Sequence, residues 1–303
     1  MFLGRAQEAL ERNGWRIRTA ASSDPKELKR LAESAVAEGC QAVFIAGGDG
    51  SVGLIASALV GSDTALGVLP SGTANVWAGE LGLTGLAWPP WAALERVAER
   101  LAHGEPRLVD VGQANGRVFL LWAGTGLDAR VVAALEPRTR LMKFVPTALY
   151  LAEVLRSSAA WDGVELEVEA EGQRWQGRFI VAVASNIRRY AGGLLELAPE
   201  ALVDDGLLDF WLLGGRSTSD VVLRIAQMLT RAHVHAPGVV HFQSTAAIFR
   251  SKDSLHLHVD GEPLETGPQL DIQILPRHLW VLTPTLGEER LFSQLDSLQA
   301  VGL

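Results

Sequence analysis

The sequence has little cysteine, no long hydrophobic run and no cluster of positive charge. Cys40 is the only cysteine among 303 residues, which excludes an internal disulfide and a metal site built on cysteines. No apolar stretch is long enough to span a bilayer, and Arg5 and Gln7 interrupt the region where a signal peptide would lie. We therefore expect a cytoplasmic protein. The net charge of −8, without a basic cluster, argues against a nucleic-acid partner.

A chain of this length, with 48% hydrophobic residues, can form two ordinary globular domains. In its first part, helical and strand-like patterns alternate, which indicates a parallel sheet covered by helices. Asp24 and Pro25 provide an N-cap and a first-turn proline for the second helix. The predicted helices are Phe2–Asn13, Lys26–Glu38 and Trp91–His103, and the predicted strands are Trp15–Thr19, Gln41–Ile45 and Leu66–Leu69.

Strand patterns take over near Leu108. Asn115-Gly116 is a two-residue hairpin signal. Apolar residues alternate with glutamates from Val164 to Glu169, as in a half-exposed antiparallel strand, and Glu171-Gly172 is predicted to turn this strand back. We therefore predict a mostly antiparallel β domain that also contains helices over Arg138–Ser157 and Ser219–Ala232. Its other predicted strands are Leu108–Gln113, Arg117–Trp122, Arg174–Ala184, Leu207–Leu213, Val239–Phe249, Leu255–Val259, Leu270–Leu275 and Leu279–Leu282.

A glycine-rich turn, Gly47-Gly48-Asp49-Gly50-Ser51, separates the strand Gln41–Ile45 from a predicted helix over Val52–Val60. The exposed backbone N–H groups and the positive end of the helix dipole favour phosphate, and the glycines allow it to approach closely. Asp49 adds a carboxylate where a cation such as Mg²⁺ would sit. A nucleotide-phosphate site is one interpretation of this turn, and a purely structural turn is the other.

The next strand, Leu66–Leu69, ends in a second small polar loop, Pro70–Asn75. The carboxyl ends of neighbouring strands in an open α/β sheet meet at one edge, where ligands bind. Gly72, Thr73 and Asn75 would then contact phosphate oxygens, although Thr73 and Asn75 could instead cap the next helix. Two such loops on consecutive strands favour the nucleotide-phosphate site.

These two motifs and three later ones resemble the diacylglycerol kinase catalytic family, which includes bacterial lipid kinases and sphingosine kinases. The family patterns GGDGT and PxGTxND are matched by Gly47–Ser51 and Pro70–Asn75. Three further segments agree in order and approximate spacing: Asp110–Phe119, Tyr190–Leu208 and Val259–Glu262. Each motif is weak alone, but five in order across nearly the whole chain are specific.

The resemblance implies a fold and a domain division. The first domain, residues 1–107, would be α/β with a parallel, Rossmann-like sheet of the NAD kinase and diacylglycerol kinase type. Residues 108–276 would form the β-rich substrate and catalytic domain, and 277–303 would return to the first. The implied activity is an ATP- and Mg²⁺-dependent transfer of the γ-phosphoryl group to a diacylglycerol-like lipid hydroxyl, as in phospholipid biosynthesis, in a cleft between the domains.

The same resemblance implies residue roles. Glu262 or Asp260 would accept the hydroxyl proton, and we favour Glu262, although Asp260-Gly261 is also an ordinary hairpin signal. Asp205 and the main-chain carbonyls of Leu202 and Leu207 would hold Mg²⁺, unless this acidic segment is only a solvated turn. Asp49 would take part in both nucleotide binding and catalysis. The implied nucleotide-binding residues are Thr19, Gly47, Gly48, Asp49, Gly50, Ser51, Val52, Gly53, Gly72, Thr73 and Asn75.

The chain departs from the family pattern in two respects that matter. It begins at the helix that follows the family's opening strand, so we expect an upstream segment that encodes this strand and an Asn-Pro-x-Ser-Gly loop. Val76 stands where the family has an acid that joins the metal–water network, whereas Ser51 in place of Thr keeps the hydroxyl. These two departures support one alternative, a non-catalytic nucleotide- or lipid-binding relative. The other alternative is an NAD kinase-like enzyme, which also uses a GGDG turn, although the Pro70–Asn75 loop matches the lipid-kinase pattern better.

We interpret two further features of the sequence as structural rather than functional. His256 and His258 share one face of a strand, which we predict to be the solvent face rather than a metal site. The helix over Arg138–Ser157 has a basic first turn, and we favour a core helix over one that touches a membrane. The partners considered are a lipid or other alcohol substrate, a transient membrane contact and a second copy of the chain in a homodimer.

Overall fold

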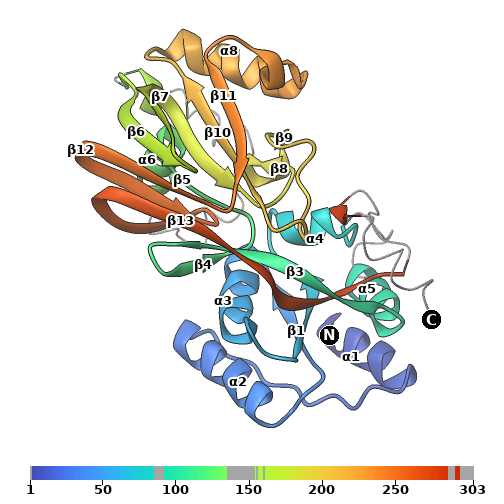
Figure 1. Ribbon diagram of the computed structural model, residues 1–303. Helices are drawn as coiled ribbons and strands as arrows, with labels where there is room; N and C mark the ends of the chain where they lie inside the picture. The colour runs from blue at the N-terminus through green and yellow to red at the C-terminus, as the bar shows by residue number, and fades with distance from the viewer. Residues whose placement is uncertain are drawn as a thin grey trace. The chain divides into compact units, whose positions relative to one another are not determined.

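The computed structural model describes residues 2–84, 92–134, 154, 156–159, 161–285 and 291–293. The chain divides into two compact units (Figure 1). Strands β3 (Glu105–Ala114) and β13 (Glu262–Thr283) contribute residues to both of them. Unit 1 comprises Met1–Val111, Leu202–Asp205 and Pro276–Leu303, and unit 2 comprises Gly112–Ala201 and Gly206–Leu275.

Unit 1 contains parallel strands between helices. β1 (Ala42–Gly47) pairs in parallel with β2 (Ala65–Pro70), and β2 pairs in parallel with β13 at Leu66 and Val281. Figure 1 shows two helix pairs on opposite sides of β1. One pair is α2 (Pro25–Ala37) with α3 (Asp49–Leu59), the other is α1 (Phe2–Arg12) with α5 (Ala93–Ala102), and the short α4 (Val76–Glu80) follows β2.

Local sequence signals explain these elements. The Asp24 side chain accepts the N–H of Lys26 at 3.0 Å, and Pro25 opens α2, as expected for a capped helix. Gly14 has a φ of 89° directly after α1. Gly67 faces the Phe44 ring, where a Cβ atom would lie 2.5 Å from Cδ1 of Phe44. The missing side chain at Gly67 therefore allows β1 and β2 to pair.

The strand predicted over Trp15–Thr19 is wrong. This segment pairs with no strand in the part of the chain that the structure describes. Trp15 instead packs edge-on against Phe44, with ring centroids 5.3 Å apart, and donates Nε1–H to the carbonyl of Ala102 at 3.2 Å. A strand needs a neighbouring backbone to satisfy its N–H and C=O groups, and sequence periodicity does not show whether one is available.

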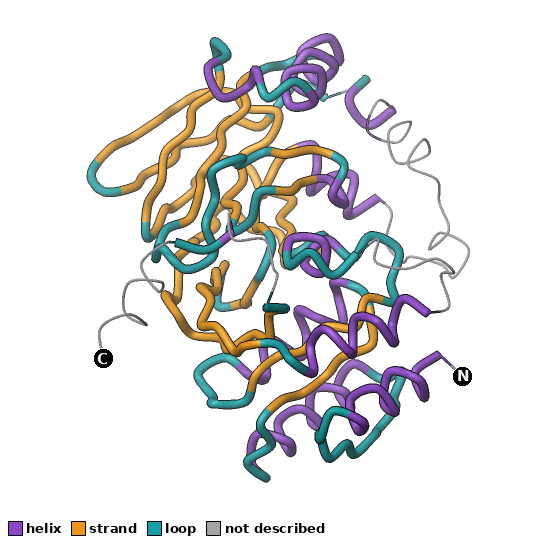
Figure 2. The backbone as a smooth tube through the Cα atoms, turned by 90° about the vertical axis from the view of Figure 1, so that its right-hand side faces the viewer, coloured by secondary structure: helices purple, strands orange, loops and turns teal. Residues whose placement is uncertain are grey.

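Unit 2 is a mostly antiparallel β structure. Figure 2, which draws strands in orange, shows how much of the backbone they make up in its upper part. Its strands hydrogen-bond in the order β13-β12-β5-β7-β10-β11, and β6 pairs with both β12 and β7. Their bounds are β4 (Arg117–Phe119), β5 (Trp122–Gly126), β6 (Val164–Ala170), β7 (Gln173–Ser185), β10 (Leu208–Gly214), β11 (Val239–Ser244) and β12 (Ala246–Val259). A small separate ladder joins β8 (Arg189–Tyr190) and β9 (Leu195–Glu196).

The turn signals of unit 2 are confirmed. Asn115 and Gly116 both have positive φ between β3 and β4, and Glu171 and Gly172 do so between β6 and β7. Helices α6 (Leu127–Ala134) and α8 (Thr218–Leu229) belong to this unit. The single strand predicted over Val239–Phe249 is two strands, because β11 pairs with β10 whereas β12 pairs with β5, β6 and β13.

Aromatic and aliphatic side chains fill the core of unit 2. Phe210 stacks on Phe242 with ring centroids 5.0 Å apart, and Phe249 meets Phe210 edge-on at 6.1 Å. Phe210 and Phe249 are fully buried, together with Leu166 and Leu257. Alternation of inward and outward residues along the strands accounts for this core. The helix predicted over Arg138–Ser157 lies mostly outside the described residues, and so does a short amphipathic helix that the sequence pattern predicts over Glu288–Gln299.

Candidate active site

The glycine-rich turn lies between the end of β1 and the start of α3. Gly48 is the N-cap of α3, and its carbonyl accepts the N–H groups of Ser51 and Val52 at 3.0 Å each. A Cβ atom on Gly47 would lie 2.7 Å from the Cβ of Ser51. Glycine is therefore required for the turn to close in this form. The first N–H groups of α3 remain at the positive end of the helix dipole, where an anion is favoured.

The second predicted loop lies directly against this turn. Ser71 N–H donates to the carbonyl of Gly47 at 3.1 Å. A Cβ atom on Gly72 would lie 2.4 Å from the Cα of Gly48. The two loops are thus brought together at the carboxyl ends of the parallel strands β1 and β2. Gly50, Ser71, Gly72 and Thr73 are all exposed there.

Asn75 and Asp49 hold the two loops in shape. The Asn75 side chain closes on Gly72 in both directions, with Oδ1 accepting its N–H at 2.9 Å and Nδ2 donating to its carbonyl at 2.8 Å. Asp49 Oδ1 accepts the backbone N–H of Trp77 at 3.1 Å, which connects α3 to α4. Val76, at the position of the family's acid, is 3% exposed. Both polar side chains therefore have a structural function in addition to any contact with phosphate.

The other implied nucleotide and metal residues are more scattered. Thr19 is exposed, and its hydroxyl donates to Gln7 Oε1 at 2.9 Å. Leu202, Asp205 and Leu207 are all half-buried. Leu202 and Asp205 belong to unit 1, whereas Leu207 belongs to unit 2. One carboxylate and two carbonyl oxygens are hard donors, which is the chemistry that Mg²⁺ requires. No cluster of three or more His, Cys, Asp or Glu side chains suited to a metal occurs in the part of the chain that the structure describes.

The neighbouring acid, Asp204, has a role within unit 1. Its side chain is almost fully buried and accepts the N–H and the hydroxyl of Ser293 at 2.6 and 2.9 Å. Asp110, which is also buried, accepts the backbone N–H of Arg277 at 2.7 Å. These carboxylates tie the returning C-terminal segment to the rest of the unit. The motif Asp204-Asp205-Gly206 is therefore more than a solvated turn.

In unit 2, the Asp260-Gly261 turn joins β12 to β13. Asp260 has a φ of 51°, and Val259 pairs with Glu262 across the turn. The Asp260 carboxylate accepts three backbone N–H groups between the end of β4 and the start of β5. They are those of Leu120 at 3.0 Å, Leu121 at 2.9 Å and Trp122 at 3.2 Å. A carboxylate that is satisfied in this way fixes the backbone around it.

The neighbouring Glu262 is in a different environment. Its carboxylate is about half-exposed and forms an ion pair with the guanidinium of Arg117. Asp260 accepts three backbone N–H groups, whereas the hydrogen bond of Glu262 comes from the side chain of Arg117. The two carboxylates that the sequence suggested as bases therefore differ in how they are held.

Sequence reasoning missed a buried polar cluster of unit 2. Asp128 Oδ2 contacts His258 Nε2 at 2.7 Å and also accepts the hydroxyl of Tyr190. The His258 side chain is 2% exposed, so its predicted position on the solvent face is wrong. Helix α6 covers this part of β12, whereas His256 remains exposed. Asp128 and His258 are 130 residues apart, and neither lies in a motif that would indicate the pair.

Asp128 and Tyr190 belong to the wall of an apolar cavity of about 250 Å³. Apart from Asp128, Tyr190 and Arg224, the wall consists of apolar residues from α6, β7, β10, α8 and the β8–β9 region, together with Val154. Such a cavity suits an aliphatic ligand with one polar end. The apolar lining is Leu127, Val154, Ile180, Val181, Ala191, Leu194, Leu195, Leu213, Val221, Ile225, Met228 and Leu229.

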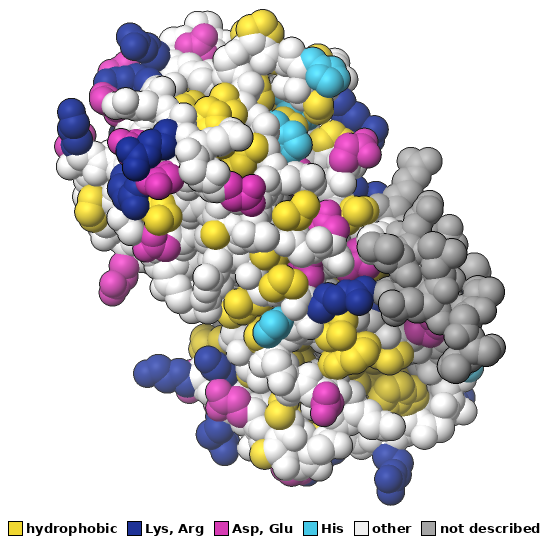
Figure 3. Space-filling view, in the orientation of Figure 1, with side chains coloured by type: hydrophobic (Ala, Val, Ile, Leu, Met, Phe, Trp, Pro, Cys, Tyr) yellow, Lys and Arg dark blue, Asp and Glu magenta, His cyan; other side chains and the backbone are white. Residues whose placement is uncertain are grey.

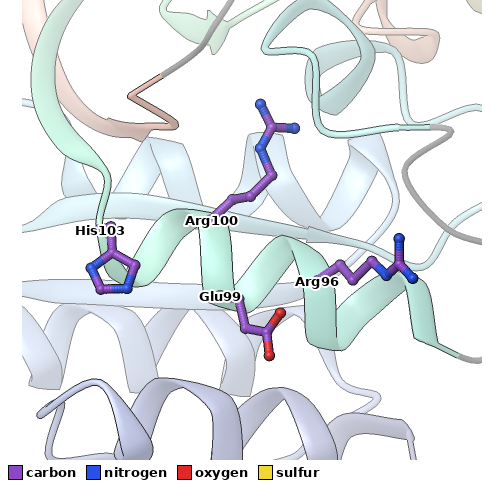
Figure 4. A pocket seen from close by; sticks show the side chains of 4 residues that line it. All are labelled: Arg96, Glu99, Arg100 and His103. Atoms are coloured by element: carbon purple, nitrogen blue, oxygen red, sulfur yellow. The ribbon is translucent and has the colours of Figure 1, made fainter.

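A wider depression of about 540 Å³ lies on α5 in unit 1. Figure 4 shows that its side chains Arg96, Glu99, Arg100 and His103 point in different directions. Arg100 donates to the carbonyl of Gly82 at 2.8 Å, and Glu99 pairs with Arg12 at 3.4 Å. Because their polar atoms do not converge, we do not consider this depression a binding site.

Charges of both signs lie interleaved on the strands of unit 2, as Figure 3 shows at the upper left. Arg250 and Arg174 contact Glu169 at 2.9 and 3.4 Å. The hydrogen bond from Arg250, together with the charge of Arg174, holds the pKa of Glu169 below its ordinary value. Paired charges of this kind form a solvated face rather than a binding patch.

None of the helices that the structure describes is long and apolar enough to cross a membrane.

Comparison with known proteins agrees with this arrangement. Residues 1–114 match the diacylglycerol kinase catalytic domain, and residues 122–283 match the YegS C-terminal NAD kinase beta sandwich-like domain. A solved diacylglycerol kinase from Bacillus anthracis str. Sterne has a TM-score of 0.69 at 17% identity, covering 94% of this chain and 91% of that one. An NAD kinase from Archaeoglobus fulgidus, solved in complex with ATP, has a TM-score of 0.52 at 12% identity, covering 99% and 95%.

These structures share with this chain a two-domain fold with a largely antiparallel second domain. The chain belongs to the family of kinases that joins a diacylglycerol kinase catalytic domain to a YegS C-terminal domain. A protein of Pseudomonas fluorescens Pf-5 named "Probable lipid kinase YegS-like" is 31% identical, covering 92% of this chain and 89% of its own. A Bacillus subtilis protein named "Diacylglycerol kinase" is 24% identical, covering 95% and 93%.

Proposed function

We propose that this protein transfers the γ-phosphoryl group of ATP to the hydroxyl of a diacylglycerol-like lipid. Membership of a kinase family supports the reaction type. The observation that carries the lipid acceptor is the cavity of about 250 Å³ in unit 2, whose wall is aliphatic apart from Asp128, Tyr190 and Arg224. An acyl chain gains free energy from such a wall, at about 0.8 kcal/mol for each buried CH₂ group.

The glycine-rich turn of unit 1 is the proposed phosphate site. The close approach of Gly48 and Gly72 leaves a surface without side chains, and the start of α3 supplies N–H groups beside it. Phosphate fits such a surface because backbone N–H groups can reach it and the helix dipole favours its charge. Thr73 and Ser51 add hydroxyl groups on the two loops.

Glu262 is the proposed general base. It accepts the proton of the acceptor hydroxyl while the oxygen forms a bond to the γ-phosphorus, and the bond from that phosphorus to ADP breaks. The Arg117 guanidinium orients the carboxylate before the acceptor arrives. Asp205 and the carbonyls of Leu202 and Leu207 would hold Mg²⁺, which would neutralise phosphate charge.

An NAD kinase-like activity is the second candidate, since the A. fulgidus NAD kinase shares the fold with a TM-score of 0.52. The adenosine and nicotinamide halves of NAD are polar, however, and the aliphatic wall of the unit 2 cavity offers them few partners. A non-catalytic relative is the third. Val76 supports it, because a buried valine cannot replace the acid of the family pattern.

Transfer of radiolabelled phosphate from ATP to a panel of acceptors separates the three candidates. The panel contains diacylglycerol, a sphingoid base, phosphatidylglycerol and NAD. We expect label in diacylglycerol. A pair of variants connects the result to the cavity: Ile225→Trp fills it from α8, whereas Ala246→Trp introduces the same side chain at an exposed position of β12 that is not part of the cavity wall. Label in NAD alone, or ATP binding without any labelled product, would refute the proposal.

A further inference from the structure

Exposed apolar side chains gather on one surface of unit 2. Five large hydrophobic side chains are exposed among the residues whose side chains the structure describes. Leu3 lies in α1, and the other four lie on α8 or on the loop beside β9. These four form what we call the α8 patch: Leu194, Val222, Leu223 and Leu229, which are 48%, 50%, 50% and 66% exposed. A gathering of this kind marks an interaction site.

Helix α8 is apolar on its outer side as well as on its inner side. Val221, Ile225 and Met228 line the cavity from within. On the outside, Val222, Leu223 and Ala226 stand where a surface helix ordinarily has charged residues. The two charged side chains of α8 are occupied locally, since Asp220 caps its first turn and Arg224 donates to the carbonyl of Gly214 at 3.0 and 3.1 Å.

The patch and the cavity share residues. Leu194 and Leu229 are both exposed and part of the cavity wall. The cavity therefore opens at the patch, so an aliphatic chain could move from one to the other without crossing a polar rim. A partner that covers the patch would contact the cavity entrance directly.

Positive charge flanks the patch. Arg216 precedes α8 and Arg231 follows it, and both are exposed. Arg231 pairs with Glu196, which balances its charge, so the exposed guanidinium of Arg216 supplies the positive charge beside the patch. An apolar surface between basic residues matches the interface of a bilayer that contains anionic lipids, where leucine side chains enter the acyl region and arginines meet phosphate groups.

We propose that the α8 patch docks on the surface of an anionic bilayer, and that the lipid acceptor enters the cavity past Leu194 and Leu229. The acceptor part of this inference rests on the proposed function. The docking part does not, because it follows from the patch and its flanking charges. A second copy of the chain is the competing occupant.

Vesicle binding tests the docking. Sedimentation uses the whole protein with vesicles of phosphatidylcholine and about one third phosphatidylglycerol. The variant Val222→Asn/Leu223→Asn should lower the partition coefficient by about tenfold or more, the factor for about 1.4 kcal/mol. Leu3→Asn, an equal change on an exposed leucine of α1, should leave it unchanged. Leu229→Asn gives an independent variant at the cavity entrance, and thermal unfolding confirms that each variant is folded.

Four outcomes are decisive. If the double variant and Leu229→Asn bind vesicles as the wild type does, the docking proposal is wrong. If gel filtration shows a wild-type dimer that both variants dissociate, the patch is a self-association surface and the proposal is likewise wrong. Turnover on dihexanoylglycerol, which is soluble as a monomer, separates docking from chemistry. The variant Val222→Asn/Leu223→Asn, which changes no residue of the cavity wall, should keep this turnover while losing turnover on vesicle diacylglycerol. Patch-dependent vesicle binding with no lipid turnover by the wild type would support docking and refute the proposed function.

Discussion

The backbones of Gly48 and Gly72 lie so close that a Cβ atom on Gly72 would stand 2.4 Å from the Cα of Gly48 and 3.0 Å from its nitrogen. The two residues belong to separate loops, and each follows a strand of the parallel pair β1 and β2. Because the obstructing atoms are backbone, neither loop can yield by turning a side chain aside. The proposed phosphate site therefore depends on both loops together.

Gly72→Ala should therefore separate the loops. We expect a loss of stability, within the range of about 1–3 kcal/mol for overpacked sites, and a larger relative loss of ATP affinity. Thermal unfolding and calorimetric titration with ATP measure the two effects. Gly4→Ala is the matched control, since a Cβ atom on Gly4 meets nothing within 4 Å and alanine favours a helix. Unchanged ATP affinity in Gly72→Ala would contradict the assignment of these loops to phosphate.

Asp49 combines a structural bond with a proposed catalytic charge, and two substitutions separate them. Asp49→Asn keeps an oxygen that can accept the Trp77 N–H but removes the negative charge. We expect it to unfold like the wild type and to lose kinase activity. Asp49→Ala should lose the activity and also about 1 kcal/mol of stability. Normal turnover and normal Mg²⁺ dependence in Asp49→Asn would show that the carboxylate is only structural.

Glu262→Gln should lower kcat by about 10²–10⁴, the usual contribution of a general base. The affinity for ATP should barely change, because this prediction assigns Glu262 to the acceptor's proton. Glu265→Gln, an exposed glutamate on the same strand, should behave as the wild type. Steady-state kinetics over pH measure the effect. A near-normal kcat in Glu262→Gln would remove the residue from the mechanism.

Asp260 should affect folding before it affects catalysis. Asp260→Ala leaves the N–H groups of Leu120, Leu121 and Trp122 without their acceptor, at a cost of about 1–3 kcal/mol for a donor that remains buried and unsatisfied. Denaturant unfolding should show this loss, while Asp253→Ala, an exposed change on β12, should stay within about 0.5 kcal/mol of the wild type. If Asp260→Ala is fully stable but inactive, Asp260 is the better candidate for the base.

The start of α8 should be sensitive to acid. The backbone N–H of Arg216, followed by the hydroxyl of Ser217, holds the pKa of the Asp220 carboxyl below its ordinary value. The stability that Asp220 contributes is then complete above about pH 3.9, the ordinary pKa of Asp, and is lost as the pH falls through the lower folded-state pKa.

Melting temperature against pH tests this prediction. Asp220→Asn should be less stable than the wild type at pH 6, and the difference should shrink toward pH 3. Ser217→Ala removes the partner hydroxyl of the capping box and should cost about 1 kcal/mol. A difference between Asp220→Asn and the wild type that grows on acidification would mean that the sign is wrong.

Local signals predicted much of the fold, since they depend only on neighbouring residues. Asn115-Gly116 and Glu171-Gly172 give positive φ where a tight hairpin needs it. The strand assigned to Trp15–Thr19 failed because pairing depends on what lies beside a segment. The position of His258 failed for a similar reason, since α6, from a distant part of the chain, covers its strand.

In the candidate site, too, the sequence predicted what neighbouring residues determine and missed what distant residues determine. The motifs Gly47–Ser51 and Pro70–Asn75 indicated that two loops would meet, and they do. The sequence could not show that Asp260 and Glu262 have different environments, because the backbone N–H groups that hold Asp260 lie about 140 residues away in the chain. The cavity was equally hidden, since its wall draws single residues from many elements.

Strands β3 and β13 each contribute to both units, and this continuity has a practical consequence for dissecting the protein. No single cut in the chain yields either unit whole. A fragment that ends at Ala114 would deprive Leu66 of its partner Val281, and one that begins at Gly112 would carry segments of unit 1 without their sheet. We expect such halves to aggregate when expressed alone, and co-expression of complementary fragments would be the way to study either unit separately.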